Sequence, residues 1–375
     1  MIRDAFGLIC PGDEIPGLRE LIEARTVAAL PIAGKYRAID FPLSNMVNSD
    51  IRSVGVIVNR KYSSLMGHLG SGKAWDLSKK SEGLSILTPY SLLGNTGVYR
   101  GKIEALKSSL HFIKKARQEY CILADVTSIY NCNYSDMMRF HIESGADITA
   151  LYHSVEKDHS VDEQYDEVFF ELSGEGRVQS IAVNPTSTTT LARSLKSYII
   201  RKDLLVQLVE ESYAKGEYKF SENILRNNIY RLRIMAFEHK GFVGMLKSVQ
   251  SYFDINMALL SPEVREELLQ RQNRIYTKAK DSVPTKYGKS VVVKNSLIAN
   301  ECIIEGSVEN SILFRNVHVG KDATIKNSII FSSVEVKEGA ELEYVVLDRD
   351  VGVRRKSRLI GSENYPIIVG KGRMV

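Results

Sequence analysis

The last third of the chain contains an internal repeat of constant length. From residue 302 onward, aliphatic residues recur at the same interval, as from Val308 to Ile325 and from Ile325 to Leu342, and within each unit they lie five or six positions apart. Three such steps per unit are typical of a parallel β-helix, in which each coil has three flat faces and points one aliphatic side chain per face inward. Four columns carry the pattern: Val308, Ile325, Leu342 and Leu359; Cys302, Val319, Val336 and Val353; Leu313, Ile330 and Leu347; and Val317, Val334 and Val351.

A single coil of this kind cannot bury its apolar face, so several coils must stack. An ordinary antiparallel sheet would instead show alternation with a period of two and Gly-Asn hairpin turns. Neither feature dominates this part of the sequence. We therefore predict a parallel β-helix domain over residues 289–375.

The first two-thirds of the chain alternates between short apolar runs and helical stretches. Runs typical of buried strands are Val54–Val58, Tyr120–Ala124 and Asp147–Tyr152, and the stretch Gly101–Arg117 has a helical apolar stripe. Alternating strands and helices predict an α/β domain with a mostly parallel sheet and ligands at the carboxyl ends of its strands. We place this domain at residues 1–255 and a helical linker at residues 256–288.

Composition and charge limit the classes of protein to which this chain can belong. The 375 residues include 50 Lys and Arg against 45 Asp and Glu, a net charge of +5, which is too small and too dispersed for a nucleic-acid binder. The four cysteines lie far apart without zinc spacing, which favours a reducing compartment. With no signal-like start and no apolar run of membrane-spanning length, the sequence predicts a cytoplasmic protein without membrane or nucleic-acid partners.

Four stretches resemble the ADP-glucose pyrophosphorylase (glucose-1-phosphate adenylyltransferase) family. They are Pro31–Asn45, Val47–Val56, Tyr99–Gly101 and Ser251–Leu259, and the order of domains also matches. The resemblance implies a Rossmann-like nucleotidyltransferase domain followed by a left-handed parallel β-helix of hexapeptide repeats. It also implies an origin in enzymes that join ATP and glucose 1-phosphate into ADP-glucose and release pyrophosphate.

The phosphate-binding loop of this family is changed in the present chain. Of the pattern L-x-G-G-x-G-T-R-L, only Gly12 and Leu18 remain, and Gly17 stands at the position of the catalytic Arg. Asp13 and Glu14 add two carboxylates where the polyphosphate of ATP would lie. Because like charges repel, this loop opposes nucleotide binding.

Further family positions are lost. Val27 replaces a phosphate-binding Lys, and Asn184 replaces the Lys of the sugar-phosphate motif E-K-P. Thr127 and Met245 replace the two Asp ligands of Mg²⁺, although a shifted register would bring Asp125 to the first of these positions. Since Mg²⁺ requires oxygen ligands such as carboxylates, the resemblance predicts no catalytic residue and no metal in this chain.

These losses lead to one principal interpretation and three alternatives. The pattern resembles the GlgD-type regulatory subunit, which implies a non-catalytic chain in a heterotetramer whose catalytic subunit holds the Mg²⁺. The alternatives are an active enzyme with a degenerate site, a module that senses a sugar phosphate or nucleotide, and an acyltransferase that uses His318.

Eight retained or nearby polar residues are candidates for a residual pocket for nucleotide, sugar phosphate or an anionic effector. The same residues can equally be kept because they organise the edge of the sheet and a subunit contact. They are Arg25, Lys35, Arg37, Asp40, Asn45, Tyr99, Arg100 and Gly101.

Overall fold

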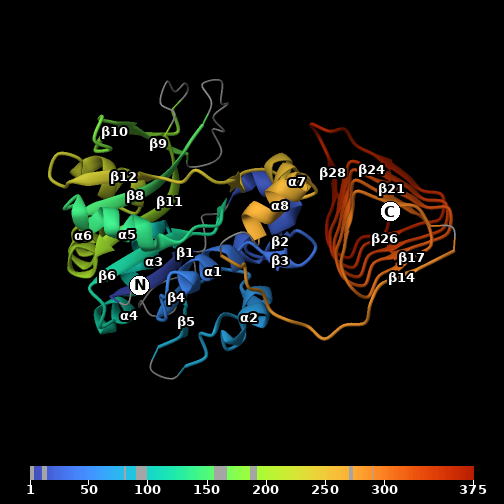
Figure 1. Ribbon diagram of the computed structural model, residues 1–375, viewed down its shortest axis with the longest axis horizontal. Coiled ribbons are helices and arrows are strands. Elements are labelled where there is room, and N and C mark those ends of the chain that lie inside the picture. Colours follow the sequence, from blue (N-terminus) through green and yellow to red (C-terminus); the bar gives the residue numbers. More distant parts are fainter. Residues whose placement is uncertain are drawn as a thin grey trace.

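The computed structural model describes residues 4–10, 15–79, 82–89, 99–155, 167–185, 192–269, 273–289 and 291–375. An α/β domain and a β-helix lie side by side, and a long extended segment joins them (Figure 1). The predicted combination of a mostly parallel sheet and a parallel β-helix is confirmed. In the described part of the chain, no helix is long and apolar enough to cross a membrane.

The α/β domain is built on a sheet in which nine described strands pair. The parallel part has the order β6-β1-β4-β5, and β11 joins β6 in antiparallel orientation. The strands are β1 (Ala5–Cys10), β4 (Val54–Ile57), β5 (Leu84–Leu87), β6 (Tyr120–Asp125), β8 (Ile148–Ser154), β9 (Val168–Leu172), β10 (Val178–Val183), β11 (Ala192–Arg201) and β12 (Ile234–Glu238).

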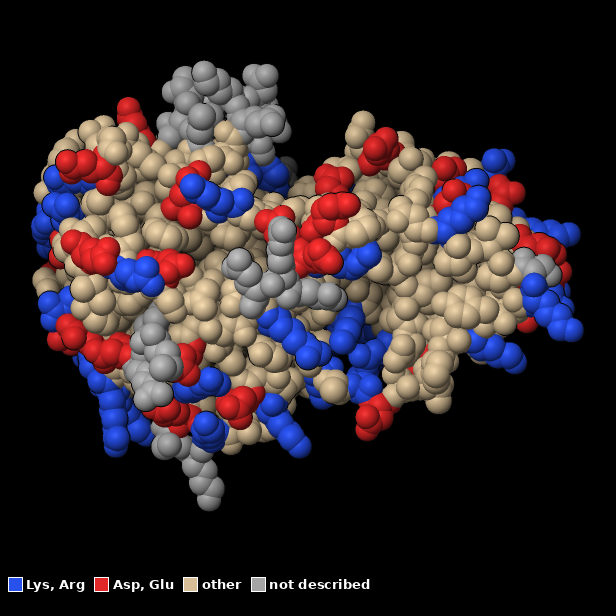
Figure 2. Space-filling model, viewed as in Figure 1, with Lys and Arg blue, Asp and Glu red and all other residues tan. Residues whose placement is uncertain are grey.

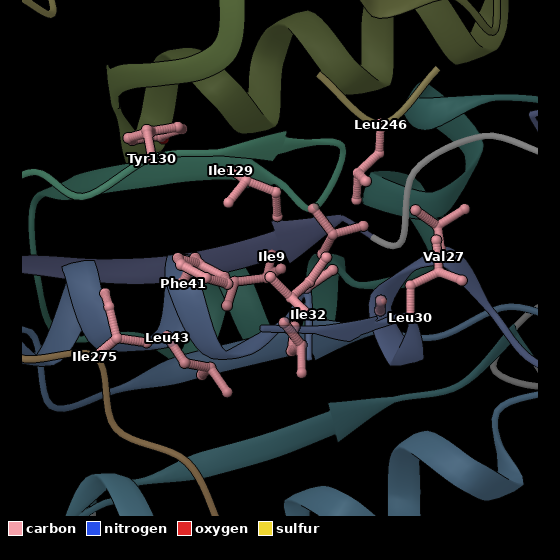
Figure 3. Packing of buried hydrophobic residues seen from close by; sticks show 14 of the residues in the cluster. Ile9, Val27, Leu30, Ile32, Phe41, Leu43, Ile129, Tyr130, Leu246 and Ile275 are labelled. Atoms are coloured by element: carbon pink, nitrogen blue, oxygen red, sulfur yellow. The ribbon is translucent and has the colours of Figure 1, made fainter. Parts of the chain in front are cut away.

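Strand β1 explains why this domain has a core on each face of the sheet. All six of its residues are buried. Successive side chains of a strand point to opposite faces, so Phe6 and Leu8 enter one hydrophobic cluster whereas Ala5 and Ile9 enter the other. Figure 3 shows part of the second cluster, which contains Ile9 of β1 together with side chains from the segment before α1, from α1 and from the linker.

Helices cover the sheet, and short elements border its carboxyl edge. The α-helices are α1 (Asp40–Asn48), α2 (Ser63–Leu69), α3 (Lys102–Ser108), α4 (Leu110–Lys115), α5 (Tyr134–Glu143), α6 (Lys202–Ala214), α7 (Val249–Ala258) and α8 (Pro262–Leu269). The short helical turns are η1 (Pro16–Ile22), η2 (Val27–Ala29), η3 (Lys73–Trp75), η5 (Phe220–Leu225) and η6 (Arg226–Asn228). Two small antiparallel strand pairs are also present: β2 (Pro31–Ile32) with β3 (Tyr36–Arg37), and β7 (Ser128–Ile129) with β13 (Gly244–Met245).

The β-helix consists of three parallel sheets of five described strands each. The first sheet contains β14 (Lys286–Tyr287), β17 (Ile303–Ile304), β20 (His318–Val319), β23 (Glu335–Val336) and β26 (Gly352–Val353). The second contains β15 (Val293–Lys294), β18 (Ser307–Glu309), β21 (Thr324–Lys326), β24 (Glu341–Glu343) and β27 (Arg358–Ile360). The third contains β16 (Leu297–Ile298), β19 (Ile312–Leu313), β22 (Ile329–Ile330), β25 (Val345–Leu347) and β28 (Ile367–Val369).

The domain limits differ from those we expected. Strand β14 already pairs with β17, so the β-helix begins at Lys286, before residue 289. Helix α7 runs across the expected limit at residue 255, and a capping box between Ser248 and Ser251 fixes its N-terminus. The repeat did not mark β14, because both of its residues are exposed and neither is aliphatic.

The third sheet of the β-helix is buried on both of its faces. Leu313 and Ile330 point into the β-helix core, whereas their neighbours Ile312 and Ile329 belong to the same hydrophobic cluster as the α/β domain. The other two sheets have polar or exposed residues beside their inward aliphatic side chains, as in His318–Val319. The third sheet is therefore the face that packs on the α/β domain.

We expect Phe331→Ala to lower the free energy of unfolding by roughly 3–5 kcal/mol, because Phe331 is fully buried between Phe314 and Tyr252 at this junction. Denaturant unfolding followed by circular dichroism would report both domains. The fluorescence of Trp75, the single tryptophan, would report the α/β domain alone. Tyr287→Ala, at a half-exposed aromatic residue of the first coil, is the control and should change little.

Candidate functional site

Arg25 forms a buried ion pair between the two domains. Its Nη1 donates to Oδ2 of Asp348 at 2.9 Å and its Nη2 donates to Oδ1 at 2.6 Å. Nη1 also donates to the carbonyl of Leu21, and the guanidinium lies 5.6 Å from the centre of the Phe331 ring. With 7% of Arg25 and 1% of Asp348 exposed, this bidentate pair joins the α/β domain to the β-helix.

Arg37 in β3 and Asp40 at the start of α1 both contact α2. Arg37 Nη1 donates to the carbonyl and the hydroxyl of Ser64, and its backbone N–H donates to Oδ2 of Asp40. His68 Nε2 lies 2.6 Å from Oδ1 of the buried Asp40. Burial lowers the pKa of Arg37; Asp40 opposes this effect, and the nearby positive charges of Arg25 and Arg349 add to it.

Lys35 and Asn45 have contrasting surroundings. Lys35 is exposed, with its ammonium 5.8 Å from the centre of the Tyr36 ring. Asn45 is fully buried in α1, donates to the carbonyl of Tyr130 and accepts from the backbone N–H of Cys132. Asn45 thereby ties α1 to the segment after β7.

Tyr99, Arg100 and Gly101 form the approach to α3. The Tyr99 hydroxyl accepts from Ser108, and Arg100 pairs with Glu104 while its guanidinium stacks 3.9 Å from the centre of the Tyr218 ring. A Cβ at Gly101 would lie 2.5 Å from the carbonyl oxygen of Tyr218, so only glycine fits there.

The eight candidate residues therefore fall into two groups. Within the described residues, no hydrogen bond, ion pair or ring contact joins the five from Arg25 to Asn45 to the three from Tyr99 to Gly101. Most of their polar atoms are used in contacts that hold elements together. These contacts support the structural interpretation of the retained residues, and their role in ligand binding stays a prediction.

An ion pair that we did not expect lies at the carboxyl edge of the sheet. Asp125 is the last residue of β6, and its Oδ2 accepts from Lys102 Nζ at 3.1 Å. Its Oδ1 accepts from the backbone N–H and the hydroxyl of Thr127. Burial raises the pKa of the Asp125 carboxyl, but the ammonium groups of Lys102 and Lys196 outweigh this and the net shift is downward.

The Asp125 carboxylate stabilises the positive charge of Lys102. Burial disfavours its charge, yet the attraction of Asp125 is stronger and raises the pKa of Lys102 above its ordinary value. Its position directly after Tyr99-Arg100-Gly101, at the start of the predicted helix, was a signal in the sequence that could have identified it.

A second group of buried charged side chains was also not predicted from the sequence. The side chain of Glu167 is fully buried, and its Oε1 lies 3.2 Å from Lys247 Nζ and 3.9 Å from Arg193 Nη2. Glu167 precedes β9, Arg193 is in β11 and Lys247 follows β13, so the fold alone brings them together. No sequence spacing connects them.

The residues at which the resemblance predicts lost family positions make structural contacts. Met245 is buried in β13 and accepts from the Ser128 hydroxyl, and Val27 is buried in η2. Asn184 pairs with the backbone of Glu167 through both its N–H and its Oδ1. A Cβ at Gly17 would lie 2.5 Å from the carbonyl oxygen of Lys247, so no side chain fits there. Gly12, Asp13 and Glu14 lie outside the described residues.

The groups near Asp125 do not fit the Mg²⁺ on which nucleotidyl transfer depends. A hard divalent cation requires several oxygen ligands, but Asp125 already accepts from an ammonium group, and Met245, which the resemblance predicts at the position of the second carboxylate, offers only a thioether. Among the described residues, no three His, Cys, Asp or Glu side chains form a group that could hold a metal ion. His318, the acyltransferase candidate, is half-buried on β20, and its Nε2 lies 3.6 Å from Oε2 of Glu305.

Comparison with known families agrees with this architecture. A family model described as "Nucleotidyl transferase" matches residues 18–261, and one described as "GlmU-like, C-terminal hexapeptide" matches residues 279–365. The first match covers more than half of the chain. The fold and these matches define a protein of the nucleotidyltransferase class with a hexapeptide-repeat domain.

Individual relatives narrow this class. The chain is 37% identical over 355 residues to "Glycogen biosynthesis protein GlgD" of Bacillus subtilis (strain 168), a match that covers 95% of this chain and 92% of the relative. It is 30% identical over 324 residues to "Glucose-1-phosphate adenylyltransferase" of Fusobacterium nucleatum subsp. nucleatum, a match that covers 85% and 83% respectively. The chain belongs to the family of GlgD proteins and glucose-1-phosphate adenylyltransferases, as its motifs indicated.

Breaking the ion pair between the domains should be costly. Arg25→Met or Asp348→Leu alone leaves one buried charge without its partner, and we expect each to lower the free energy of unfolding by about 3–5 kcal/mol. The double variant should recover much of this loss because both charges are gone. Denaturant unfolding of the four proteins measures the coupling, and additive losses in the double variant would contradict it.

Lys102→Met should destabilise the protein in a manner that depends on pH. At neutral pH the variant leaves the buried Asp125 carboxylate without its hydrogen-bonded cation and with only the charge of Lys196 to stabilise it, so the pKa of Asp125 rises and stability falls by about 3 kcal/mol. As pH falls toward about 4, protonation of Asp125 relieves the variant, whereas the wild type keeps its ionised pair, so the difference between them shrinks. Lys114→Met, in an exposed ion pair, is the matched control, and a loss independent of pH would contradict the prediction.

Proposed function

We propose that this protein is a non-catalytic, regulatory subunit of a glucose-1-phosphate adenylyltransferase in glycogen biosynthesis. The names of its relatives, "Glycogen biosynthesis protein GlgD" and "Glucose-1-phosphate adenylyltransferase", support the pathway and the partner. The observation that carries the non-catalytic part is the Lys102–Asp125 ion pair, in which an ammonium group engages the carboxylate at the carboxyl edge of the sheet.

The Lys102–Asp125 ion pair argues against catalysis because the reaction has strict charge requirements. Nucleotidyl transfer depends on positioning and on cations that stabilise the negative charge of the phosphates. Removing one such group typically costs about two to three orders of magnitude in rate. Here Met245 and Gly17 stand at two further positions of this machinery, and packing excludes a larger side chain at Gly17.

The proposed partner is a catalytic relative with the same two domains, in a heterotetramer. Over most of the face shown in Figure 2, acidic and basic side chains are interspersed on both domains. A surface without one dominant sign of charge supports a protein partner rather than an extended polyanion. The subunit would change the partner's substrate affinity or its response to effectors by making better contacts with one of the partner's two conformations.

The decisive experiment measures ADP-glucose synthesis with Mg²⁺ for this protein alone, for the catalytic relative from the same cell alone, and for their mixture. We expect no turnover from this protein alone, and a changed kcat or KM in the mixture together with co-elution from a sizing column. Robust turnover by this protein alone would contradict its non-catalytic role. Unchanged kinetics without co-elution would contradict the regulatory role.

A second candidate function is the binding of an anionic effector where the domains meet. In Figure 2, basic side chains gather at the lower part of this junction, and the charges of Arg25 and Arg349 act on Arg37. Calorimetric titration with ATP, ADP-glucose, glucose 1-phosphate and fructose bisphosphate tests it. Binding that Arg37→Gln weakens would support this function, whereas heat from none of the four would contradict it.

A further inference from the structure

The last coil of the β-helix contains an insertion. Strand β22 pairs with β25 with Ile329 opposite Val346, whereas β25 pairs with β28 with Val346 opposite Ile368, a longer step along the chain. The additional residues include the segment 361–366, which we call the strap. The strap is ordered by its own backbone, because Ser362 and Tyr365 exchange both of their N–H to carbonyl hydrogen bonds.

The strap contacts the α/β domain at two points. Arg19 Nη1 in η1 donates to the Tyr365 hydroxyl at 3.1 Å, and the guanidinium lies 5.6 Å from the centre of the Tyr365 ring. Gln250, in the first turn of α7, donates from Nε2 to the carbonyl of Glu363 at 2.9 Å. Together these contacts connect the strap to both η1 and α7.

Arg19 has a strained backbone at the point of contact. Its φ of 44° and ψ of −125° interrupt the helical turn, a conformation that residues with a side chain rarely adopt. On either side of it, Leu18 and Leu21 are completely buried. The strained residue therefore lies between two buried leucines, and its side chain makes a solvent-exposed contact with Tyr365.

The strained segment leads to the carboxyl edge of the sheet. Gly17 packs so closely on the backbone of Lys247 that a Cβ would lie 2.5 Å from its carbonyl oxygen. The side chain of Lys247 in turn pairs with the buried Glu167. A movement of η1 toward Lys247 at Gly17 would therefore press on the backbone that carries this lysine. A hollow of about 300 Å³, lined in part by Gly17, Arg19 and Tyr365, leaves room for such a movement.

We propose that the strap is a conformational latch that holds η1 in its strained state. With Tyr365 seated on Arg19, the segment 16–23 is fixed and the Lys247–Glu167 pair is in place. A subunit or ligand that draws Tyr365 away from Arg19 releases the strain, and η1 relaxes together with the segment 247–250. The β-helix thus acts on the carboxyl edge of the sheet through a contact separate from the buried Arg25–Asp348 pair.

Hydrogen exchange followed by mass spectrometry tests the latch. Tyr365→Ala removes the hydrogen bond and the ring, so peptides over residues 16–23 and 247–250 should exchange about three- to tenfold faster. Peptides over α1 should keep their rate, which separates local release from general destabilisation. Tyr230→Ala, at a tyrosine that is 93% exposed elsewhere in the α/β domain, is the control. Unchanged exchange over residues 16–23 in Tyr365→Ala would overturn the proposal.

A double variant tests whether strain is involved. Glycine adopts the backbone conformation of Arg19 readily. In the Tyr365→Ala protein the contact between Arg19 and Tyr365 is already absent, so Arg19→Gly only relieves the backbone strain. The exchange of residues 20–23 should therefore slow toward the wild-type rate. In the protein with an intact strap the same substitution also removes the Tyr365 contact, so exchange should not slow. Equal effects of Arg19→Gly in the two backgrounds would show that strap and strain are uncoupled and would overturn the latch.

Discussion

The buried ion pair between Arg25 and Asp348 is the interaction on which the arrangement of the two domains depends. Its partners are far apart in the sequence, and both charges are removed from water. A buried charge is tolerated only with a well-placed partner, so the α/β domain and the β-helix are fixed relative to each other at this point. The aromatic ring of Phe331 beside Arg25 and that of Tyr252 beside Phe331 complete an apolar junction around the pair.

This junction gives a physical reason for the retention of the family motifs. Helix α7 carries one of the matching stretches, and within it Tyr252 donates to the carbonyl of Pro31 while Asn256 accepts from the backbone N–H of Ala33. Pro31 and Ala33 belong to another matching stretch. The motifs thus hold each other in place against the third sheet of the β-helix. Such contacts preserve sequence whether or not the chain performs chemistry.

Much of the fold could be predicted because it depends on short-range periodicity. The columns of Val319 and Leu313 repeat since every coil must place an aliphatic residue at the same point of the core. Strand β14 of the first coil was missed because Lys286 and Tyr287 are exposed and neither is aliphatic, so they do not show the pattern of the later coils. The pairs Ile312–Leu313 and Ile329–Ile330 are apolar at adjacent positions, which indicates a sheet that is covered on its outer face as well.

The candidate site was less predictable because charge pairing depends on distance in space. From the sequence, Arg25 is a possible effector contact, and nothing near it suggests a residue in the last coils as its partner. The pairing of Asp125 with Lys102 could not be predicted from the sequence for the same reason, since strand β6 and the start of α3 meet only when the sheet has formed. Side-chain type indicates what chemistry is possible, whereas burial and partners decide which charges remain available.

The sequence by itself determined the two kinds of domain and their order, because these follow from residue type and regular spacing, and its motifs indicated the family through their resemblance to known members. Only the tertiary structure decided that Lys102 engages Asp125, that Arg25 joins the domains, and that the strap reaches Arg19. Each of these pairs brings together residues from elements distant in the chain. Their electrostatic and packing energies exist only after the hydrophobic cores have set those elements side by side.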